Sequence, residues 1–205
     1  MKEIKIKGSM IYILPVIHAL QGEEKKVKDA FEKIKPDCVA IAIPPEDLEI
    51  IGRVDGEEVE MSLQHQYYLL HLSTYGKISL PPRDITLAHE MAVEKNIPLK
   101  AIDVDDMEYA ELLTQHVSLI SLIRHSRKIK KLGKRKFKAK NAEEFVMEWE
   151  KEVNSIKDFR EMEDKREEKM VDNLIKLCEE YRKILAIFPL EKYEKIVSRL
   201  ERYKK

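Results

Sequence analysis

Four short apolar runs, separated by stretches with helical periodicity, constrain the fold of this chain more than any other feature of its sequence. The runs cover residues 10–14, 38–43, 99–102 and 184–188. Each has the length of a buried strand and is shorter than an ordinary helix. A strand, a helix and a second strand in succession form a βαβ unit with parallel strands. We therefore predict a three-layer α/β fold, with a mostly parallel central sheet flanked by helices.

The N-terminus predicts a β-hairpin at the edge of that sheet. Ile4 and Ile6 alternate with lysines, which is typical of a charged edge strand. Gly8 and Ser9 supply a turn before the first buried run. Pro15 is predicted to end the second strand of the hairpin, because proline cannot donate a hydrogen bond to a sheet.

Periodicity and capping residues place the helices. Apolar residues recur at helical spacing within residues 22–35, and Asn141 with Glu144 indicates the N-terminus of another helix. The predicted helices span residues 22–35, 57–75 with Gly76 as the cap, 81–96, 107–132, about 141–182 (a long charged helix) and 190–203.

Composition limits the classes of protein that fit. The 205 residues suit a single domain covering 1–205, and 38 basic side chains balance 38 acidic ones. No apolar run approaches the ~20 residues of a spanning helix, and the N-terminus lacks a signal peptide pattern. Cys38 and Cys178 have no metal-like spacing and predict free thiols. We predict a cytoplasmic protein without a membrane partner. Scarce Asn and Gln with abundant Lys and Glu suit a heat-adapted source.

Polar residues follow the predicted strands at their carboxyl ends. Residues 15–18, 44–47 and 103–106 would share one edge of the sheet, where open α/β folds bind ligands. His18 and Asp103 are therefore candidate site residues. The ordinary alternatives are a histidine bonded to backbone and aspartates that cap the next helix.

Several short motifs resemble the TraB/PrgY family, which is related to the Tiki metalloproteases and to ChaN and erythromycin-esterase-like proteins. The first is a strand ending in Pro15-Val16-Ile17-His18, similar to the G-x-x-H strand end of that family. The other pieces are Lys35-Pro36-Asp37, Glu90-Met91-Ala92, Ile102-Asp103, Arg166-Glu167-Glu168-Lys169-Met170 and the closing segment 184–196.

The chain departs from the family at residues that its site would use. Pro15 and Pro189 stand where the family has glycine, and Ala42 stands where it has an acidic residue. Lys192 occupies the place of a second histidine, and Val104 replaces the arginine that follows Asp103 in the resemblance. The resemblance thus implies a degenerate member of the family.

The family resemblance implies a metal-assisted hydrolytic site with two histidines and a carboxylate. His18 alone cannot form such a site, and the cation of Lys192 would repel a metal. We therefore predict no cofactor and a disfavoured divalent metal, with His18 as its only candidate ligand. The predicted function is binding of a small anionic or peptide ligand by His18, Glu90, Asp103, Arg166 and Lys192. His18 and Arg166 are the candidate catalytic residues if activity remains.

Other readings stay open. Residues 124–140 hold ten lysines and arginines and no acid, in a loop or a helix end, and Lys134, Arg135 and Lys136 could bind nucleic acid or an acidic protein. Phe137 is the only aromatic residue there. An active metal-dependent hydrolase or peptidase with altered ligands is another alternative, and a homo-oligomer built on the long helix is a third. Arg166 and Lys192 could also be ordinary surface cations.

Overall fold

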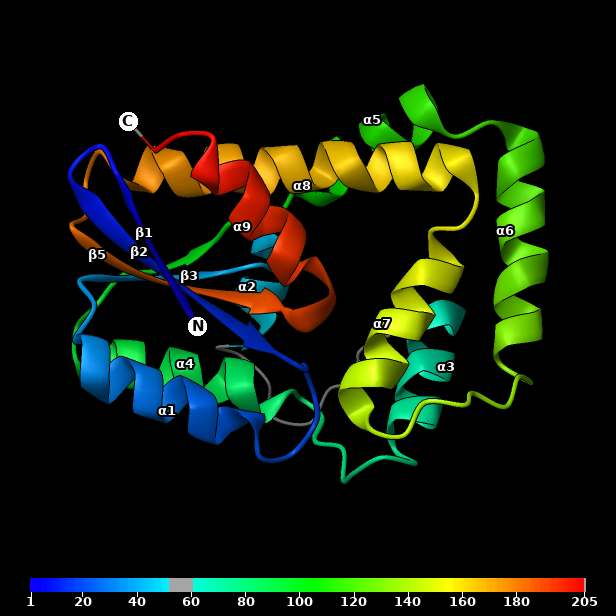
Figure 1. Cartoon of the computed structure of the whole chain (residues 1–205), viewed down its shortest axis with the longest axis horizontal. Coiled ribbons are helices and arrows are strands. Elements are labelled where there is room, and N and C mark those ends of the chain that lie inside the picture. The colour runs from blue at the N-terminus through cyan, green and yellow to red at the C-terminus, as the bar shows by residue number, and fades with distance from the viewer. Residues whose placement is uncertain (52–60, 205) are drawn as a thin grey trace.

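The structure is a computed structural model that describes residues 1–51 and 61–204. Its centre is a five-stranded sheet with the strand order β1-β2-β5-β3-β4 (Figure 1). β1 and β2 are antiparallel, and the other pairings of this sheet are parallel. The predicted α/β class, mostly parallel sheet and N-terminal hairpin are confirmed. The strands are β1 (Lys2–Ile6), β2 (Ser9–Val16), β3 (Cys38–Ile41), β4 (Leu99–Ala101) and β5 (Lys183–Pro189).

The hairpin turn depends on two residues with positive φ. Lys7 has a φ of 50° and Gly8 a φ of 85°, the pattern of a two-residue turn that matches the twist of the flanking strands. The prediction that Pro15 ends β2 is wrong by one residue, since the strand continues to Val16. β1 pairs with β2 only as far as Ile13, so the missing N–H of Pro15 costs no hydrogen bond to β1.

Helices cover both faces of the sheet, as Figure 1 shows. α1 (Glu23–Ile34) and α4 (Arg83–Glu94) pack on one face, against alternate strand residues such as Ile41 and Ile187. α8 (Lys157–Leu177) and α9 (Tyr193–Glu201) pack on the other face, against Ala40 and Ala186. Because successive strand residues point to opposite faces, a continuous apolar run buries both sides at once.

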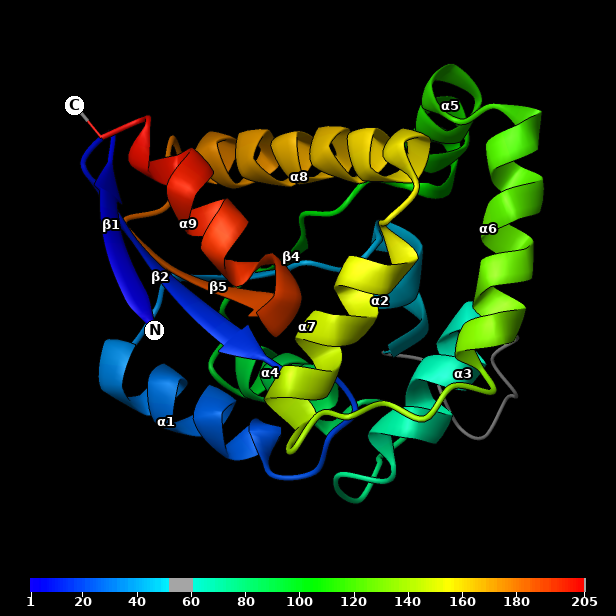
Figure 2. The ribbon, with the colours of Figure 1, turned by 45° about the vertical axis from the view of Figure 1, so that its right-hand side comes forward.

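A separate group of helices lies beyond the carboxyl ends of the parallel strands (Figures 1 and 2). α3 (Leu63–Leu72), α6 (Leu119–Leu132) and α7 (Ala142–Val153) form this helical group. Its core includes Leu72, Leu132, Phe145 and Trp149. The short helix α2 (Pro45–Ile51) follows β3, α5 (Asp106–His116) follows β4, and the 3-10 turn η1 (Leu190–Lys192) follows β5. The sheet edge with the candidate residues therefore faces the helical group.

Two predicted long helices are each broken in two. The helix predicted over 141–182 is α7 followed by α8, and the chain turns between them at residues 154–156. The helix predicted over 107–132 is α5 followed by α6, because Val117 is extended and buried and Ser118 caps a new helix by accepting a hydrogen bond from the Ser121 N–H. Helical periodicity alone did not reveal either break.

The helix predicted over 57–75 is shorter in the structure. α3 begins after Ser62, whose side chain accepts a hydrogen bond from the His65 N–H, and ends at Leu72. Residues 57–60 lie outside the described residues. Gly76 is not its cap: a Cβ there would lie 2.7 Å from Cδ1 of Leu20, so close packing explains this glycine. Among the described helices, none combines the length and apolar character needed to span a membrane.

Candidate ligand-binding site at the carboxyl edge of the sheet

His18 lies just after β2, and Asp84 holds it in place. Nδ1 of His18 donates a hydrogen bond of 2.6 Å to Oδ2 of Asp84, while the Ala19 N–H donates one of 3.3 Å to Oδ1. Ala19 has a φ of 69°, a strained conformation for a residue with a Cβ. Asp84 comes from the first turn of α4, where the helix dipole stabilises a buried carboxylate.

The second ring nitrogen of His18 has no hydrogen-bond partner among the described residues. Nε2 is buried, although the side chain as a whole keeps 20% of its surface exposed. Burial lowers the pKa of His18, but the charge and hydrogen bond of Asp84 outweigh this, so that the pKa is raised. The charges of Glu191 and Glu23 act in the same direction. Nε2 is thus an oriented and unused hydrogen-bonding group.

Glu191 lies within electrostatic reach of His18, and Glu150 lies within electrostatic reach of Glu191. Burial and the charge of Glu150 raise the pKa of Glu191 to about 7, and the charge of His18 opposes this. Burial also raises the pKa of Glu150, whose carboxylate accepts a hydrogen bond of 2.7 Å from Asn154. The pKa of the Tyr68 hydroxyl is raised by burial first and then by the same two glutamates. A buried carboxyl group whose pKa is raised toward neutral pH, as for Glu191, is typical of functional sites.

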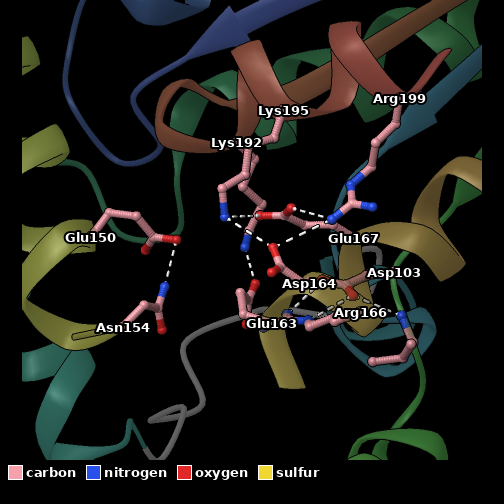
Figure 3. A network of polar contacts seen from close by, with 11 residues as sticks. Asp103, Glu150, Asn154, Glu163, Asp164, Arg166, Glu167, Lys192, Lys195 and Arg199 are labelled. Carbon is pink, nitrogen blue, oxygen red and sulfur yellow. Dashed lines mark hydrogen bonds and ion pairs between the residues drawn. The ribbon is translucent and has the colours of Figure 1, made fainter. Parts of the chain in front are cut away.

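Next to this group lies a buried ion-pair network, drawn in Figure 3. Arg166 on α8 donates two hydrogen bonds to Asp103 after β4, from Nε at 2.8 Å and from Nη2 at 2.5 Å. Glu163 lies 3.5 Å from Nη1 of Arg166 and accepts a hydrogen bond from Nζ of Lys192. Burial raises the pKa of Glu163, but the charges of Lys192 and Arg166 outweigh it and lower that pKa to about 2.

The network continues along α8 and α9. Glu167 is fully buried and lies 3.2 Å from Nζ of Lys195 and 3.5 Å from Nη2 of Arg199. Asp164 lies 3.4 Å from Lys195 and 3.3 Å from Arg199. Figure 3 shows these side chains meeting from the two helices. Each buried cation therefore has at least one carboxylate partner, which is the condition for burying charge at low cost.

The structure brings together some of the predicted residues and separates others. Arg166, Asp103 and Lys192 meet through Glu163, while His18 is linked to them only through Glu191, the neighbour of Lys192 in the chain. The alternative that Lys192 is a surface lysine is wrong, since its side chain is buried against Glu163. The alternative of a solvated Arg166 is also wrong. Both cations already have partners.

Glu90 is placed differently from the other candidates. It is exposed and accepts two hydrogen bonds from Arg83, at 2.5 Å and 3.0 Å. The residue of α4 that contacts His18 is Asp84, six positions before Glu90 and on another face of the helix. Asp105 accepts a hydrogen bond from the Glu108 N–H and caps α5, which agrees with the alternative that these aspartates cap the next helix.

Sequence reasoning missed Asp84, Glu163 and Glu191. Asp84 stands two residues after the Pro81-Pro82 pair that opens α4, which is a signal for a helix start and not for a histidine partner. Glu163 precedes Arg166 by three residues, a spacing that does predict an ion pair on a helix. Glu191 precedes Lys192, but the family motif concerns only the position of the lysine, so Glu191 was not considered.

The side chains at this edge do not fit a metal centre. A hydrolytic metal site takes three protein ligands, with neutral histidine or carboxylate donors. Asp84 holds Nδ1 of His18 and leaves Nε2 as its one free donor atom among the described residues, an arrangement that a metal-bound histidine can also have. The position of a second family histidine, however, holds the cation of Lys192. Within residues 1–51 and 61–204, no group of three His, Cys, Asp or Glu residues is placed to hold a metal ion.

The basic segment 124–140 lies away from this edge. Its first part belongs to α6, and residues 133–140 connect α6 to α7. Lys128 pairs with Glu152 at 2.6 Å, and Arg135 pairs with Glu148 at 2.8 Å and with Glu152 at 2.7 Å. The acidic side chains of α7 therefore neutralise part of the segment.

Together, these features define an α/β protein with a histidine site at the carboxyl edge of its sheet and a buried ion-pair network beside it. Comparison of the chain with models of known protein families and with curated proteins gives no match. The resemblance to the TraB family accordingly remains a hypothesis based on short motifs.

Proposed function

We propose that this chain is a degenerate TraB-like protein that binds a small peptide, or a comparably polar small molecule, at the His18 site. One observation carries the proposal: Nδ1 of His18 is held by Asp84, and Nε2 is buried without a partner among the described residues. An oriented imidazole of this kind loses free energy until a ligand atom satisfies it. Tyr68 and Glu191 lie close enough to contribute further polar contacts.

The raised pKa of His18 favours its protonated form, in which Nε2–H is a donor and needs an acceptor on the ligand, such as a peptide carbonyl. The acidic side chains around His18 favour a ligand that also carries an ammonium group. Asp84, Glu191 and Glu23 are the carboxylates whose charges act on His18, whereas Arg166 and Lys192 are already paired with carboxylates. An anion would have to displace Asp103 or Glu163 to reach either cation. A peptide amino terminus or basic side chain therefore suits the charges of the site better than an anion does.

Nuclear magnetic resonance of the His18 imidazole tests the proposal directly. Short peptides of positive, zero and negative net charge are added separately, and the Nε2 resonance of His18 is followed. The positively charged peptide should bind most tightly and shift that resonance, and His18→Ala should abolish the binding. His89→Ala, at a histidine elsewhere on α4, is the matched control. Tightest binding of the negatively charged peptide, or equal binding by His18→Ala, contradicts the proposal.

The absence of metal-dependent chemistry is part of the proposal, and calorimetry can test it. Titration with zinc, manganese or cobalt should show no tight binding, because the donors at the sheet edge do not fit a metal. Tight binding that disappears in His18→Ala would support the alternative of an active metal-dependent hydrolase.

We also propose a cytoplasmic location for the protein. Cys38 and Cys178 are both free and buried, and burial raises the pKa of the Cys38 thiol to about 12. Unpaired, unreactive thiols are typical of a reducing compartment. Cell fractionation with labelled protein tests this location.

A further inference from the structure

The outer face of α6 combines exposed apolar side chains with exposed cations. Leu119, Ile120 and Ile123 keep 73%, 63% and 46% of their surfaces exposed. α6 stands at the edge of the molecule in both views (Figures 1 and 2), and the opposite face of the helix carries its buried residues. The α6 surface is defined by these three residues together with the exposed cations Arg124, Arg127, Lys130, Lys131, Lys134, Lys136, Lys138 and Lys140.

The apolar residues and the cations of α6 itself lie on one side of the helix, and the remaining cations follow in residues 134–140. Leu119, Ile123, Arg127 and Lys131 follow one another at intervals of four residues, which places them in a single row. Ile120 lies beside this row, three residues before Ile123. The first turns of α6 are therefore apolar on the outside, and the later turns are cationic.

The cations of the α6 surface are available for an external partner. Of the ten basic residues in 124–140, Lys128 and Arg135 pair with carboxylates of α7. Within the described part of the chain, the other eight have no ion pair with a carboxylate. Unpaired like charges so close together repel one another, and an anionic surface would relieve this repulsion.

The apolar residues distinguish between two anionic partners. A nucleic acid contacts cations through its phosphates and stacks its bases on aromatic rings. Phe137, the one aromatic side chain of the segment, is already packed, with its ring centroid 5.0 Å from that of His71 and 5.1 Å from that of Phe145. A lipid bilayer instead needs apolar side chains for its acyl boundary and cations for its headgroups.

We propose that the α6 surface binds the anionic surface of a lipid bilayer, with Leu119, Ile120 and Ile123 entering the headgroup boundary and the cations contacting the headgroups. The protein then lies on a membrane without spanning it, which departs from the prediction from the sequence that it has no membrane partner. The cytoplasmic leaflet, which carries anionic lipids, fits the location proposed above. This inference is independent of the His18 site and stands or falls separately from it.

Vesicle co-sedimentation of the full chain tests the proposal. Vesicles of phosphatidylcholine with phosphatidylserine should bind the protein, and vesicles of phosphatidylcholine alone should not. Added salt should weaken the binding, because it screens the headgroup charge. Lys130→Glu with Lys131→Glu should reduce the affinity by at least about fivefold for each position. The control pair Lys25→Glu with Lys33→Glu changes exposed lysines of α1 and should leave binding unchanged.

The apolar part of the surface needs its own variants. Leu119→Ser with Ile120→Ser should reduce vesicle binding at least tenfold, since transfer of two such side chains into lipid is lost. Val93→Ser on α4, at a side chain with 66% exposure, is the matched control and should bind normally. All of the changed side chains are exposed, so circular dichroism and thermal unfolding should match those of the parent protein.

Three outcomes would overturn the proposal. The first is no binding to phosphatidylserine vesicles at low salt. The second is tight binding of RNA or DNA, with no vesicle binding and no effect of Leu119→Ser with Ile120→Ser, which would assign the cations to nucleic acid. The third is a dimer by light scattering that dissociates in the same variant, which would assign the apolar residues to a second copy of the chain.

Discussion

The protein has two cation-rich regions, and they treat the same kind of side chain in opposite ways. In and around the interior network, the buried Lys192, the partly buried Arg166 and Arg199 and the exposed Lys195 are each paired with a carboxylate. On the surface, most basic residues of 124–140 are exposed and lack such a partner within the described residues. The positions of lysines and arginines in the sequence therefore did not show which cations pair within the fold and which are free to bind an external partner. Partners supplied by distant segments make that distinction.

The largest expected effect comes from removing a buried cation. Lys192→Met leaves Glu163 without its closest partner, and an uncompensated buried charge costs about 3–5 kcal/mol of unfolding free energy. Lys130→Met removes an exposed lysine of the other region and should change stability by less than about 0.5 kcal/mol. Urea unfolding of both variants makes the measurement. Equal effects would remove the contrast between the two regions.

A smaller loss is expected at the opposite end of the network. Asp103→Asn weakens the two hydrogen bonds from Arg166, which keeps Glu163 at 3.5 Å as a second partner. Hydrogen bonds to charged groups contribute about 1.5–3 kcal/mol, so a loss in that range is expected. A double-mutant cycle with Arg166→Met, followed by urea unfolding, isolates the pair. A coupling free energy near zero would show that the pair is not a stabilising unit.

The pH dependence of stability should differ between the carboxylates of the interior. The folded-state pKa of Glu191 is raised from an ordinary 4.5 to about 7, so its contribution to stability is present below about pH 4.5 and is lost as pH rises through 7. Glu163 behaves in the opposite way: its contribution is lost as pH falls from 4.5 toward about 2.

Glu191→Gln tests this sign, because glutamine resembles the protonated carboxyl group at every pH. Relative to this variant, the parent protein should lose roughly 3 kcal/mol of stability between pH 4.5 and pH 8. Thermal or urea unfolding at several pH values gives the difference. A difference that does not change with pH, or that changes in the other direction, contradicts the raised pKa.

The smallest effect is expected for a cation that is paired at the surface. Arg135 lies 2.8 Å from Glu148 and 2.7 Å from Glu152, but its side chain remains 40% exposed. Solvent screens such pairs, so Arg135→Gln should cost at most about 1 kcal/mol in urea unfolding. A loss of unfolding free energy as large as that of Lys192→Met would mean that the stabilisation by an ion pair does not depend on its burial.

Much of the fold could be predicted, because local patterns encode it. The apolar runs at 10–14, 38–43 and 184–188 correspond to β2, β3 and β5, and the hairpin follows from the alternation before Gly8. The breaks at Val117 and at residues 154–156 were not predicted. Both lie within sequences that continue a helical pattern, and packing against other elements decides where such a helix ends.

Less of the site could be predicted. The position of His18 at the sheet edge followed from the order of strands and helices, since parallel strands end on the same side. Its partner did not, because Asp84 is 66 residues away and reaches His18 only when α4 packs on the sheet. The resemblance pointed to Lys192 and Arg166 as anion binders, and it gave no signal of the carboxylates that pair with them in the folded protein.

By itself, the sequence determined the strands, most of the helices and the sheet edge on which His18 lies, because hydrophobic period and turn residues are local properties of the chain. The tertiary structure alone decided which charged side chains have partners within the protein. Arg166 and Lys192 became partners of Asp103 and Glu163, Nε2 of His18 was left without one among the described residues, and the outer cations of α6 stayed exposed. Burial raises the cost of an unpaired charge, and burial exists only after distant segments have packed together.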